Sequence, residues 1–204
     1  MNEFYQLDLP LLNDSLHKKL VNLSAAIAVS QEKRKWLQDF CAGNFTVAYQ
    51  EYGTELTQID SDTHNDLNMI FSAYFPGEQI QYVLGKIESV PNTVSVVPPH
   101  CDRGRFTACN FVLETGGENV ETVFYDFERD TNDLNSAVNF KENDVKVESS
   151  VVFKSNCWYV FNAQQAHGVT NITGSRYLLS LLFDSNIKYH DFVVRYKHLL
   201  RGCG

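Results

Sequence analysis

The sequence predicts a mainly β protein, an antiparallel sandwich or barrel flanked by helices. Three observations predict this class. Short runs rich in β-branched and aromatic residues lie between residues 79 and 184, and turn residues separate them. Near each end of the chain, the apolar positions instead recur every three or four residues, which indicates helices. The 204 residues are 44% hydrophobic and 21% charged, a composition that suits one domain with its own core.

The chain is expected to form a single domain over residues 1–204, with three parts in chain order. Residues 1–75 are a helical support region, residues 79–184 are the β core, and residues 186–202 are a C-terminal helix. Within the core, the charged and Asn-rich segment 126–143 is predicted to be an insertion between two strands. No internal repeat divides the chain.

The N-terminal region carries the helix signals. Asn13 or Asp14 can cap a helix whose apolar positions are 16, 20, 23 and 27. Ser30 can cap a second helix that ends near residue 40. Segment 46–56 fits no single element. Segment 59–68 is rich in Asp and Asn and is predicted to be a loop, because these residues favour turns.

The β core is predicted from apolar runs that end at turn residues. Gly116 and Gly117 mark a hairpin, and Pro98 and Pro99 mark a break between two strands. Trp158 is expected to pack in the core, because adjacent aromatic residues in a strand usually do. The runs, in chain order, are IQYVLGKI, VSVV, FTACNFVL, VETVFY, VKVESSVVF, CWYVF and YLLSLLF.

Charge and cysteine content narrow the partners and the compartment. The net charge is −8 and the pI is about 5.2, so the overall field repels nucleic acid and anionic lipid. No apolar run approaches the roughly 18 residues of a membrane span, and the N-terminus lacks a signal-peptide pattern. The 5 cysteines show no CxxC spacing and favour reduced thiols. We expect a soluble, cytoplasmic protein with no nucleic-acid or membrane partner.

A candidate metal site comes from the sequence PPHCD. Residues two apart in a strand point to the same face, so His100 and Asp102 can present an imidazole and a carboxylate side by side. His167, which follows the apolar run CWYVF and a short polar link, is the candidate third ligand. Two histidines and one carboxylate on one face of a metal are typical of non-haem Fe(II) oxygenases. The alternative is an ordinary hydrogen-bonded His–Asp pair at a strand end.

A second His-x-Asp sequence complicates this prediction. His64 and Asp66 have the same spacing but lie in the polar segment 59–68, where no apolar alternation predicts a core-facing strand. We interpret this second pair as a chance copy and place the metal site at His100 and Asp102.

Arg176 opens the apolar run YLLSLLF, nine residues after His167. A guanidinium at the start of an apolar strand is costly to bury unless an anion pairs with it. Because a guanidinium holds a carboxylate through two parallel hydrogen bonds, Arg176 is a candidate for binding a carboxylate ligand. The alternative is a surface position at the strand start.

The order of these motifs resembles the Fe(II)- and 2-oxoglutarate-dependent dioxygenases, and the likeness covers roughly residues 79–184. PNTVSVVPPHCDRGR and NAQQAHGVTNITGSRYLLSLLF are most similar to the aspartyl/asparaginyl hydroxylase and proline cis-hydroxylase branch. The resemblance implies a double-stranded β-helix core, that is, a cupin-like jelly-roll. It also implies an oxidoreductase, in particular a hydroxylase, that uses Fe(II), O2 and 2-oxoglutarate as cosubstrate.

Carried over to this chain, the resemblance assigns iron binding to His100, Asp102 and His167, and the far carboxylate of 2-oxoglutarate to Arg176. Many relatives have Ser two residues after that arginine, whereas this chain has Leu178. The second partner of the carboxylate is therefore open. Tyr82 and Asn110, on flanking strands, are the candidates.

Arg103 and Arg105 are the candidates for substrate binding. They follow the metal motif directly, in a turn that Gly104 loosens, at the expected mouth of the barrel. Two guanidinium groups there suit a carboxylate on the substrate, which we expect to be a small molecule or an amino-acid or peptide side chain. Segment 126–143 is a candidate lid. Alternatively, the two arginines neutralise that acidic insertion in solvent.

Two other classes of protein share parts of this pattern. One is a non-catalytic jelly-roll that binds a sugar or a peptide. The other is a cupin-like metal protein that uses the same three ligands without 2-oxoglutarate. Arg176 discriminates between them and the oxygenase, because neither needs an arginine directed at the metal cavity.

Overall fold

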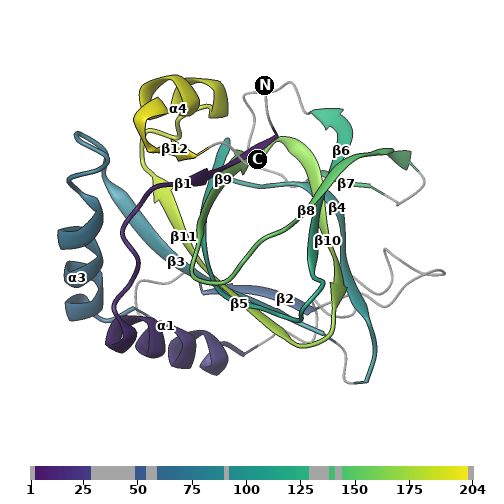
Figure 1. The fold of residues 1–204 in the computed structure, drawn as a ribbon, viewed down its shortest axis with the longest axis horizontal. Coiled ribbons are helices and arrows are strands. Elements are labelled where there is room, and N and C mark those ends of the chain that lie inside the picture. Colours follow the sequence, from purple (N-terminus) through teal and green to yellow (C-terminus); the bar gives the residue numbers. More distant parts are fainter. Residues whose placement is uncertain are drawn as a thin grey trace.

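The protein is described by a computed structural model that covers residues 3–28, 49–53, 59–89, 92–128, 138–140 and 144–201. Two antiparallel sheets face each other and enclose the interior, with the helices outside them (Figure 1). This arrangement confirms the mainly β class with flanking helices. Residues 30–40, where a second helix is predicted, lie outside the described part of the chain, as does most of the insertion 126–143.

The larger sheet has seven strands and is built from segments far apart in the chain. Its spatial order is β12-β1-β9-β5-β11-β3-β2, and every pairing in it is antiparallel. The strands are β1 (Phe4–Leu7), β2 (Tyr49–Gly53), β3 (Ile80–Glu88), β5 (Thr107–Thr115), β9 (Trp158–Asn162), β11 (Ser175–Phe183) and β12 (Leu200–Arg201).

The smaller sheet has five strands, in the order β7-β4-β10-β6-β8. Its central strand, β10, pairs with β4 on one side and with β6 on the other. The two candidate histidine ligands, His100 on β4 and His167 on β10, therefore belong to one sheet. The strands are β4 (Ser95–Cys101), β6 (Glu121–Glu128), β7 (Val138–Asn139), β8 (Val147–Val152) and β10 (Gln165–Ile172).

One face of the larger sheet packs against the helices, and the other face lines a cavity between the sheets. On β5, Cys109, Phe111 and Leu113 pack into the core that the helices cover. Asn110 and Val112, which alternate with them, line a cavity between the sheets. A strand exposes successive side chains to opposite faces, so one strand supplies both the structural core and the wall of the cavity.

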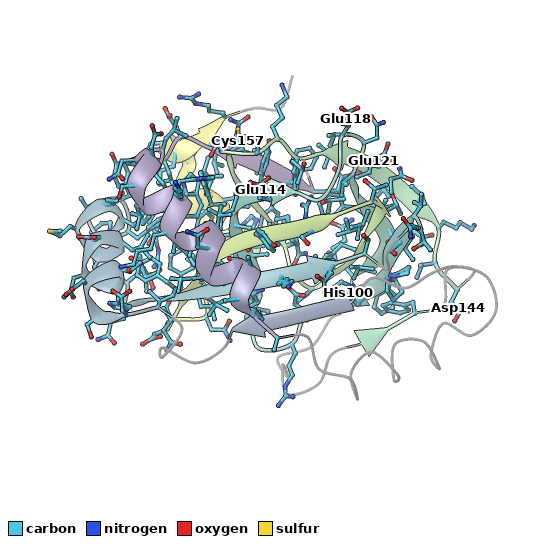
Figure 2. The ribbon with its side chains drawn as sticks, turned by 90° about the horizontal axis from the view of Figure 1, so that it is seen from below. His100, Glu114, Glu118, Glu121, Asp144 and Cys157 are labelled. Carbon is cyan, nitrogen blue, oxygen red and sulfur yellow. The ribbon has the colours of Figure 1, made fainter. Side chains whose placement is uncertain are left out.

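Helix α1 (Asp14–Ala26) covers the outer face of the larger sheet, as Figure 2 shows from the helix side. The Asn13 side chain caps it by accepting a hydrogen bond from the Leu16 backbone N–H at 2.9 Å. Leu16 and Leu20 are buried against the sheet. The predicted helix and its cap at Asn13 are thus confirmed. At its far end, the buried Lys86 of β3 donates to the carbonyls of Ala25 and Ile27.

The predicted loop over 59–68 is wrong, because helix α3 (Ser61–Phe71) occupies this segment. Asp60 caps it by accepting from the Thr63 backbone N–H at 2.9 Å. Leu67 and Phe71, at helical spacing, are fully buried in the core. The Asp and Asn residues that suggested a loop serve as the cap and as the solvent-facing side of the helix.

The ends of the chain also differ from the prediction. Helix α4 (Tyr189–Arg195) is shorter than the predicted helix over 186–202, and a 3₁₀ turn (Lys197–Leu199) follows it. Strand β12 then pairs with β1, an N-terminal strand in a region predicted to be only helical. These pairings close one edge of the larger sheet. Their strands are too short for an alternation pattern to reveal them.

The predicted break at Pro98 and Pro99 is wrong as well, because β4 continues through both residues. Proline has no N–H to donate but keeps its carbonyl. The Pro99 carbonyl accepts from the Phe140 backbone N–H at 2.9 Å, next to the short β7 pairing. The strand thereby reaches His100 without interruption.

The thiol groups that the structure describes agree with the predicted reduced state. Of the cysteines that the structure describes, Cys109 and Cys157 are free, and Cys101 and Cys109 are buried. Burial raises the pKa of the Cys109 thiol, which makes it less reactive. In the described part of the chain, no helix is both long and apolar enough to cross a membrane.

Candidate metal centre

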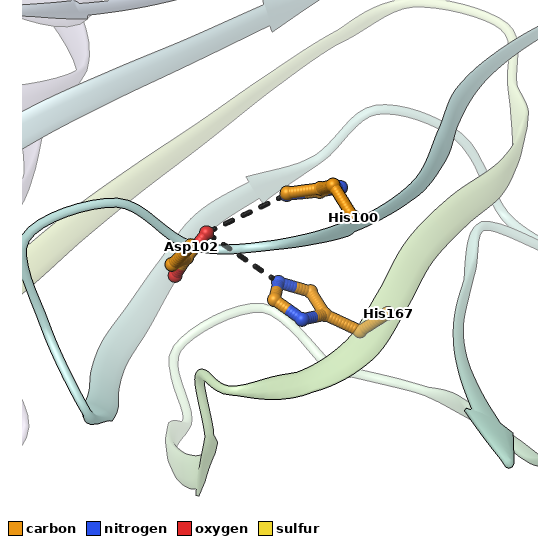
Figure 3. A group of neighbouring side chains, drawn as sticks. All are labelled: His100, Asp102 and His167. Atoms are coloured by element: carbon orange, nitrogen blue, oxygen red, sulfur yellow. Dashed lines mark ion pairs between the residues drawn. The ribbon is translucent and has the colours of Figure 1, made fainter. Parts of the chain in front are cut away.

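Pairing between β4 and β10 brings the two histidines together. His100 and His167 are direct cross-strand partners, and their ring centroids lie 4.5 Å apart. Asp102 follows β4 by one residue and turns its carboxylate towards both rings (Figure 3). In the described part of the chain, these three residues are the only group whose side chains are arranged to hold a metal ion. The structure therefore brings the predicted ligands together.

The distances within the group suit a shared metal ion. Asp102 Oδ1 lies 3.5 Å from His100 Nε2 and 3.7 Å from His167 Nε2. All three candidate ligand atoms lie within 4.8 Å of one another. Two imidazoles and one carboxylate are donors that non-haem iron accepts.

Backbone carbonyls set the orientation of both rings. His100 Nδ1 donates to the Pro98 carbonyl, and His167 Nδ1 donates to the Gln165 carbonyl, each at 2.9 Å. Because a carbonyl can only accept, each Nδ1 carries the proton and each neutral ring keeps a lone pair on Nε2. This is the arrangement that metal-binding histidines adopt in proteins. The residues present therefore fit a divalent metal such as Fe(II).

The charges around Asp102 and His167 favour the protonation states in which these side chains can bind a cation. Burial by itself would raise the pKa of Asp102, but the Arg105 guanidinium, with help from the two histidines, holds that pKa well below its usual range. Burial, followed by repulsion from His100, lowers the pKa of His167 to about 4. At neutral pH the site thus holds a carboxylate and a neutral imidazole, the protonation states that metal ligands need.

The lowered pKa of His167 predicts a loss of stability in acid. Between pH 6.5 and about 4, the unfolded chain binds a proton at this residue that the folded chain does not. We expect the free energy of unfolding of the metal-free protein to fall by about 3 kcal/mol across this window. Urea unfolding in a chelator, from pH 7.5 down to pH about 4, measures it. His167→Gln should remove most of this pH dependence, whereas the control His64→Gln should retain it. If the free energy of unfolding changes equally with pH in both variants, the assignment to His167 is wrong.

A narrow cavity connects the metal centre to Arg176. The arginine is 2% exposed, and its Nη1 donates to the Thr115 carbonyl at 3.2 Å. The predicted alternative, a surface position, is therefore wrong. The lining residues are Ile87, Val97, His100, Arg105, Asn110, Val112, Thr122, Phe153, Phe161, His167, Val169, Arg176 and Leu178.

The turn at Gly116 fixes the position of the Arg176 backbone. Gly116 has a φ of +83°, and a Cβ built on it would lie 2.9 Å from the Arg176 Cβ. Its carbonyl also accepts hydrogen bonds from Thr173 and Gly174, which lead into β11. The turn at Gly116 and Gly117 thus lies directly against the arginine. The hairpin predicted there is wrong, because β5 and β6, on either side of the turn, belong to different sheets.

The two candidates for a second carboxylate partner fall on opposite faces of the larger sheet. Asn110 lines the cavity, and its Oδ1 accepts from Ser180 Oγ at 2.7 Å. Tyr82 points to the helix side, where its hydroxyl donates to Asn68 Oδ1 at 3.0 Å. The structure does not bring Tyr82 to the cavity, which corrects that prediction. Successive side chains on β3 point to opposite faces of the sheet, and Tyr82 falls on the helix side whereas Ile87 falls on the cavity side.

The two arginines of the predicted substrate site lie in different surroundings. Arg105 is largely buried, lines the cavity, and donates from Nε to Asp102 Oδ2 at 2.7 Å. Arg103 is exposed in the intervening turn. Arg105 is therefore a partner of the metal motif rather than a free group at the mouth. The role of Arg103 in substrate binding stays a prediction.

Sequence reasoning missed three residues that support the site. Ser180 lies on the same face of β11 as Arg176, and its interruption of the apolar run YLLSLLF was a signal available in the sequence. Gln164 donates to the backbone carbonyls of Asp102 and Arg105. Gly168 allows β10 to approach β4, because a Cβ there would lie 2.7 Å from the Val97 carbonyl oxygen. Nothing in the sequence marks these last two contacts.

The second His-x-Asp pair does not assemble with the site. His64 lies on α3, where its Nδ1 contacts Asn68 Nδ2 at 3.1 Å and its ring packs edge-on against Tyr82. Asp66 is exposed on the same helix. The structure thus brings His100 and Asp102, rather than His64 and Asp66, together with His167.

No protein-family model matches this sequence, and no curated protein matches it either. Solved structures do match. One is the non-heme alpha ketoglutarate dependent epimerase SnoN from nogalamycin biosynthesis, at 14% identity and a TM-score of 0.53, covering 89% of this chain and 78% of that one. SnoN in complex with Fe3+, alpha ketoglutarate and nogalamycin RO matches at 11% identity and a TM-score of 0.50, covering 89% and 79%.

A Pseudomonas putida prolyl-4-hydroxylase also matches, at 14% identity and a TM-score of 0.46, covering 90% of this chain and 93% of the hydroxylase. At such identities the likeness concerns the fold alone. The chain thus has the predicted double-stranded β-helix fold, which it shares with the alpha ketoglutarate dependent epimerase SnoN, and its HxD…H residues form one group that could hold a metal ion. The aspartyl/asparaginyl hydroxylase and proline cis-hydroxylase branch stays a prediction.

Proposed function

We propose that this protein is an Fe(II)- and 2-oxoglutarate-dependent oxygenase. The observation that carries the proposal is that the buried Arg176 lines the same cavity as His100 and His167, which form one group with Asp102. When bound, iron would supply the ability to activate dioxygen for oxidation of a C–H bond. The fold that it shares with the non-heme alpha ketoglutarate dependent epimerase SnoN supports this reading.

The residues of this chain have separate tasks in the proposed reaction. His100, Asp102 and His167 would bind the metal from one side and leave its other side open. Arg176 would bind the far carboxylate of 2-oxoglutarate, since it is a buried cation in the lining of the same cavity. Apolar side chains such as Val112, Phe161 and Leu178 keep water away from the reacting groups.

We propose hydroxylation as the outcome. One 2-oxoglutarate, one O2 and one substrate C–H bond would give succinate, carbon dioxide and a C–OH group, which balances all atoms. The substrate would be a small molecule or an amino-acid or peptide side chain. Epimerisation is the second candidate, because one protein with this fold is described as an epimerase. The free thiols of Cys109 and Cys157 favour a reducing compartment such as the cytoplasm.

Arg176 separates this proposal from a cupin-like metal protein that does not use 2-oxoglutarate. Burying a guanidinium without an anionic ligand has a substantial desolvation cost. In the proposed enzyme, the cosubstrate carboxylate compensates that cost. A metal protein without 2-oxoglutarate does not need an arginine in the cavity of its metal ligands.

An anaerobic titration tests the proposed function. We expect Fe(II) to bind the protein and 2-oxoglutarate then to produce a weak visible charge-transfer band, because a keto acid that chelates Fe(II) absorbs in this way. Succinate, which lacks the keto group, is the control and should give no band. Iron binding with no spectral response to 2-oxoglutarate would favour the cupin-like alternative. With oxygen and a substrate, product analysis separates hydroxylation from epimerisation.

A further inference from the structure

We propose that Arg105 is a positioning residue that makes Asp102 bind the metal through one oxygen only. The inference rests on the proposed function, since it assigns a task beside the same metal centre. A carboxylate that binds through both oxygens occupies an additional coordination position. By holding one oxygen away, Arg105 keeps that position available for 2-oxoglutarate or dioxygen.

The two oxygens of Asp102 have different neighbours. Oδ1 faces the Nε2 atoms of His100 and His167, at 3.5 and 3.7 Å. Oδ2 accepts a hydrogen bond from Arg105 Nε at 2.7 Å. A hydrogen bond between charged groups at this distance is strong, and a guanidinium does not lose its proton in proteins. Oδ2 is therefore engaged at every pH at which the protein is folded and Asp102 is ionised.

The backbone around Arg105 is held in place. Gly104 has a φ of +82°, which turns the chain so that Arg105 points back to Asp102 three residues earlier. Gln164 Nε2 donates to the Arg105 carbonyl at 2.6 Å, and the Asp102 backbone N–H donates to the Ala163 carbonyl at 2.9 Å. The turn is thus tied to the segment that leads into β10 and His167.

The far end of the guanidinium is held by the other sheet. Arg105 Nη1 donates to Asn110 Oδ1 at 3.4 Å, and the same oxygen accepts from Ser180 Oγ at 2.7 Å. Asn110 and Ser180 lie on β5 and β11, and both are buried. Arg105 therefore spans from the metal group to the larger sheet, and its side chain is only 14% exposed. Because both Asp102 and Asn110 bind its guanidinium, Arg105 is a fixed partner of Oδ2 rather than a mobile surface charge.

The experiment compares variants loaded with Co(II), whose visible spectrum reports the number of metal ligands. Arg105→Met keeps much of the side-chain volume but cannot donate to Oδ2. We expect its Co(II) bands to weaken before 2-oxoglutarate is added, as coordination rises. We expect the affinity of the Co(II) protein for 2-oxoglutarate to fall about 10- to 100-fold, an effect as large as the loss of such an outer partner has on metal affinity or activity. Its Co(II) affinity should change by less than that.

Two further variants complete the design. Arg105→Lys retains one cationic donor for Oδ2 and should restore the wild-type Co(II) spectrum. Arg201→Ala is the matched control, because it removes an exposed arginine–aspartate pair, with Asp8, on strand β12. It should leave the spectrum and the affinity for 2-oxoglutarate unchanged. Circular dichroism confirms that each variant is folded.

Two outcomes would overturn the assignment of Arg105. If Arg105→Met binds 2-oxoglutarate less well but keeps the wild-type Co(II) spectrum, the arginine contacts the cosubstrate and does not set the binding mode of Asp102. If Arg105→Met loses Co(II) itself, the arginine only maintains the ligand set. Failure of the proposed function is distinct: the wild-type Co(II) spectrum would then not respond to 2-oxoglutarate. The spectra without 2-oxoglutarate would still test Arg105.

Discussion

Replacing His167 with alanine should abolish iron-dependent conversion of 2-oxoglutarate to succinate, with a loss of at least about 1000-fold. A metal ion contributes several kcal/mol to such chemistry, and each 1.36 kcal/mol corresponds to a factor of ten in rate. His167 is 5% exposed, and its Nδ1 is bound to a backbone carbonyl, so neighbouring water cannot readily take over the role of its Nε2. The measurements are succinate formation and the iron content of the purified protein.

The matched control is His64→Ala. His64 belongs to the other His-x-Asp sequence, is partly buried, and also has a hydrogen-bonded Nδ1. It lies on α3, outside the cavity, so its loss should affect stability but neither iron content nor succinate formation. Equal loss of iron in the two variants, or full iron content in His167→Ala, would contradict the metal site.

Arg176→Ala should have the second large effect, which should fall on 2-oxoglutarate rather than on iron. Loss of one charged partner from a buried ion pair costs about 2 to 5 kcal/mol in affinity, or roughly 30- to several thousand-fold. Arg176 lies on β11 of the larger sheet, whereas both metal histidines lie on the smaller sheet. Calorimetric titrations of metal and of 2-oxoglutarate separate the two affinities.

Lys86→Met is the control for Arg176→Ala. Lys86 is also a buried cation, on the neighbouring strand β3, but it points to the helix side and binds carbonyls at the end of α1. Its removal should lower stability and leave 2-oxoglutarate affinity unchanged. A supporting variant, Gly116→Ala, places a Cβ against the Arg176 Cβ and should weaken 2-oxoglutarate binding without removing the charge. Unchanged affinity in Arg176→Ala would exclude the arginine as the carboxylate partner.

The strands of the core were predictable where apolar residues run together. CWYVF and YLLSLLF became β9 and β11 because strands between a helix layer and a cavity are largely apolar on both faces. β10 was not predicted, since its first residues are Gln165 and Ala166 and its cavity face carries His167. A strand that supplies a polar site loses the hydrophobic pattern by which strands are recognised.

Side-chain direction limited the prediction of the site in the same way. Tyr82 and Asn110 were equal candidates from the sequence, but they occupy opposite faces of the larger sheet. A shift of one residue in register exchanges the two faces, so no local pattern distinguishes them. Arg105 is a similar case, because its pairing with Asp102 requires the turn at Gly104 to fold back.

The sequence by itself determined the mainly β class, the first helix with its cap at Asn13, and the three candidate ligands, because these depend on periodicity and on the spacing of a few residues. The tertiary structure decided which of these residues meet. His100 and His167 are adjacent only because β4 and β10 pair in one register. Arg176 shares their cavity only because the second sheet faces the first. Contacts between distant segments arise from burial and strand pairing across the whole chain, and no local run of residues encodes them.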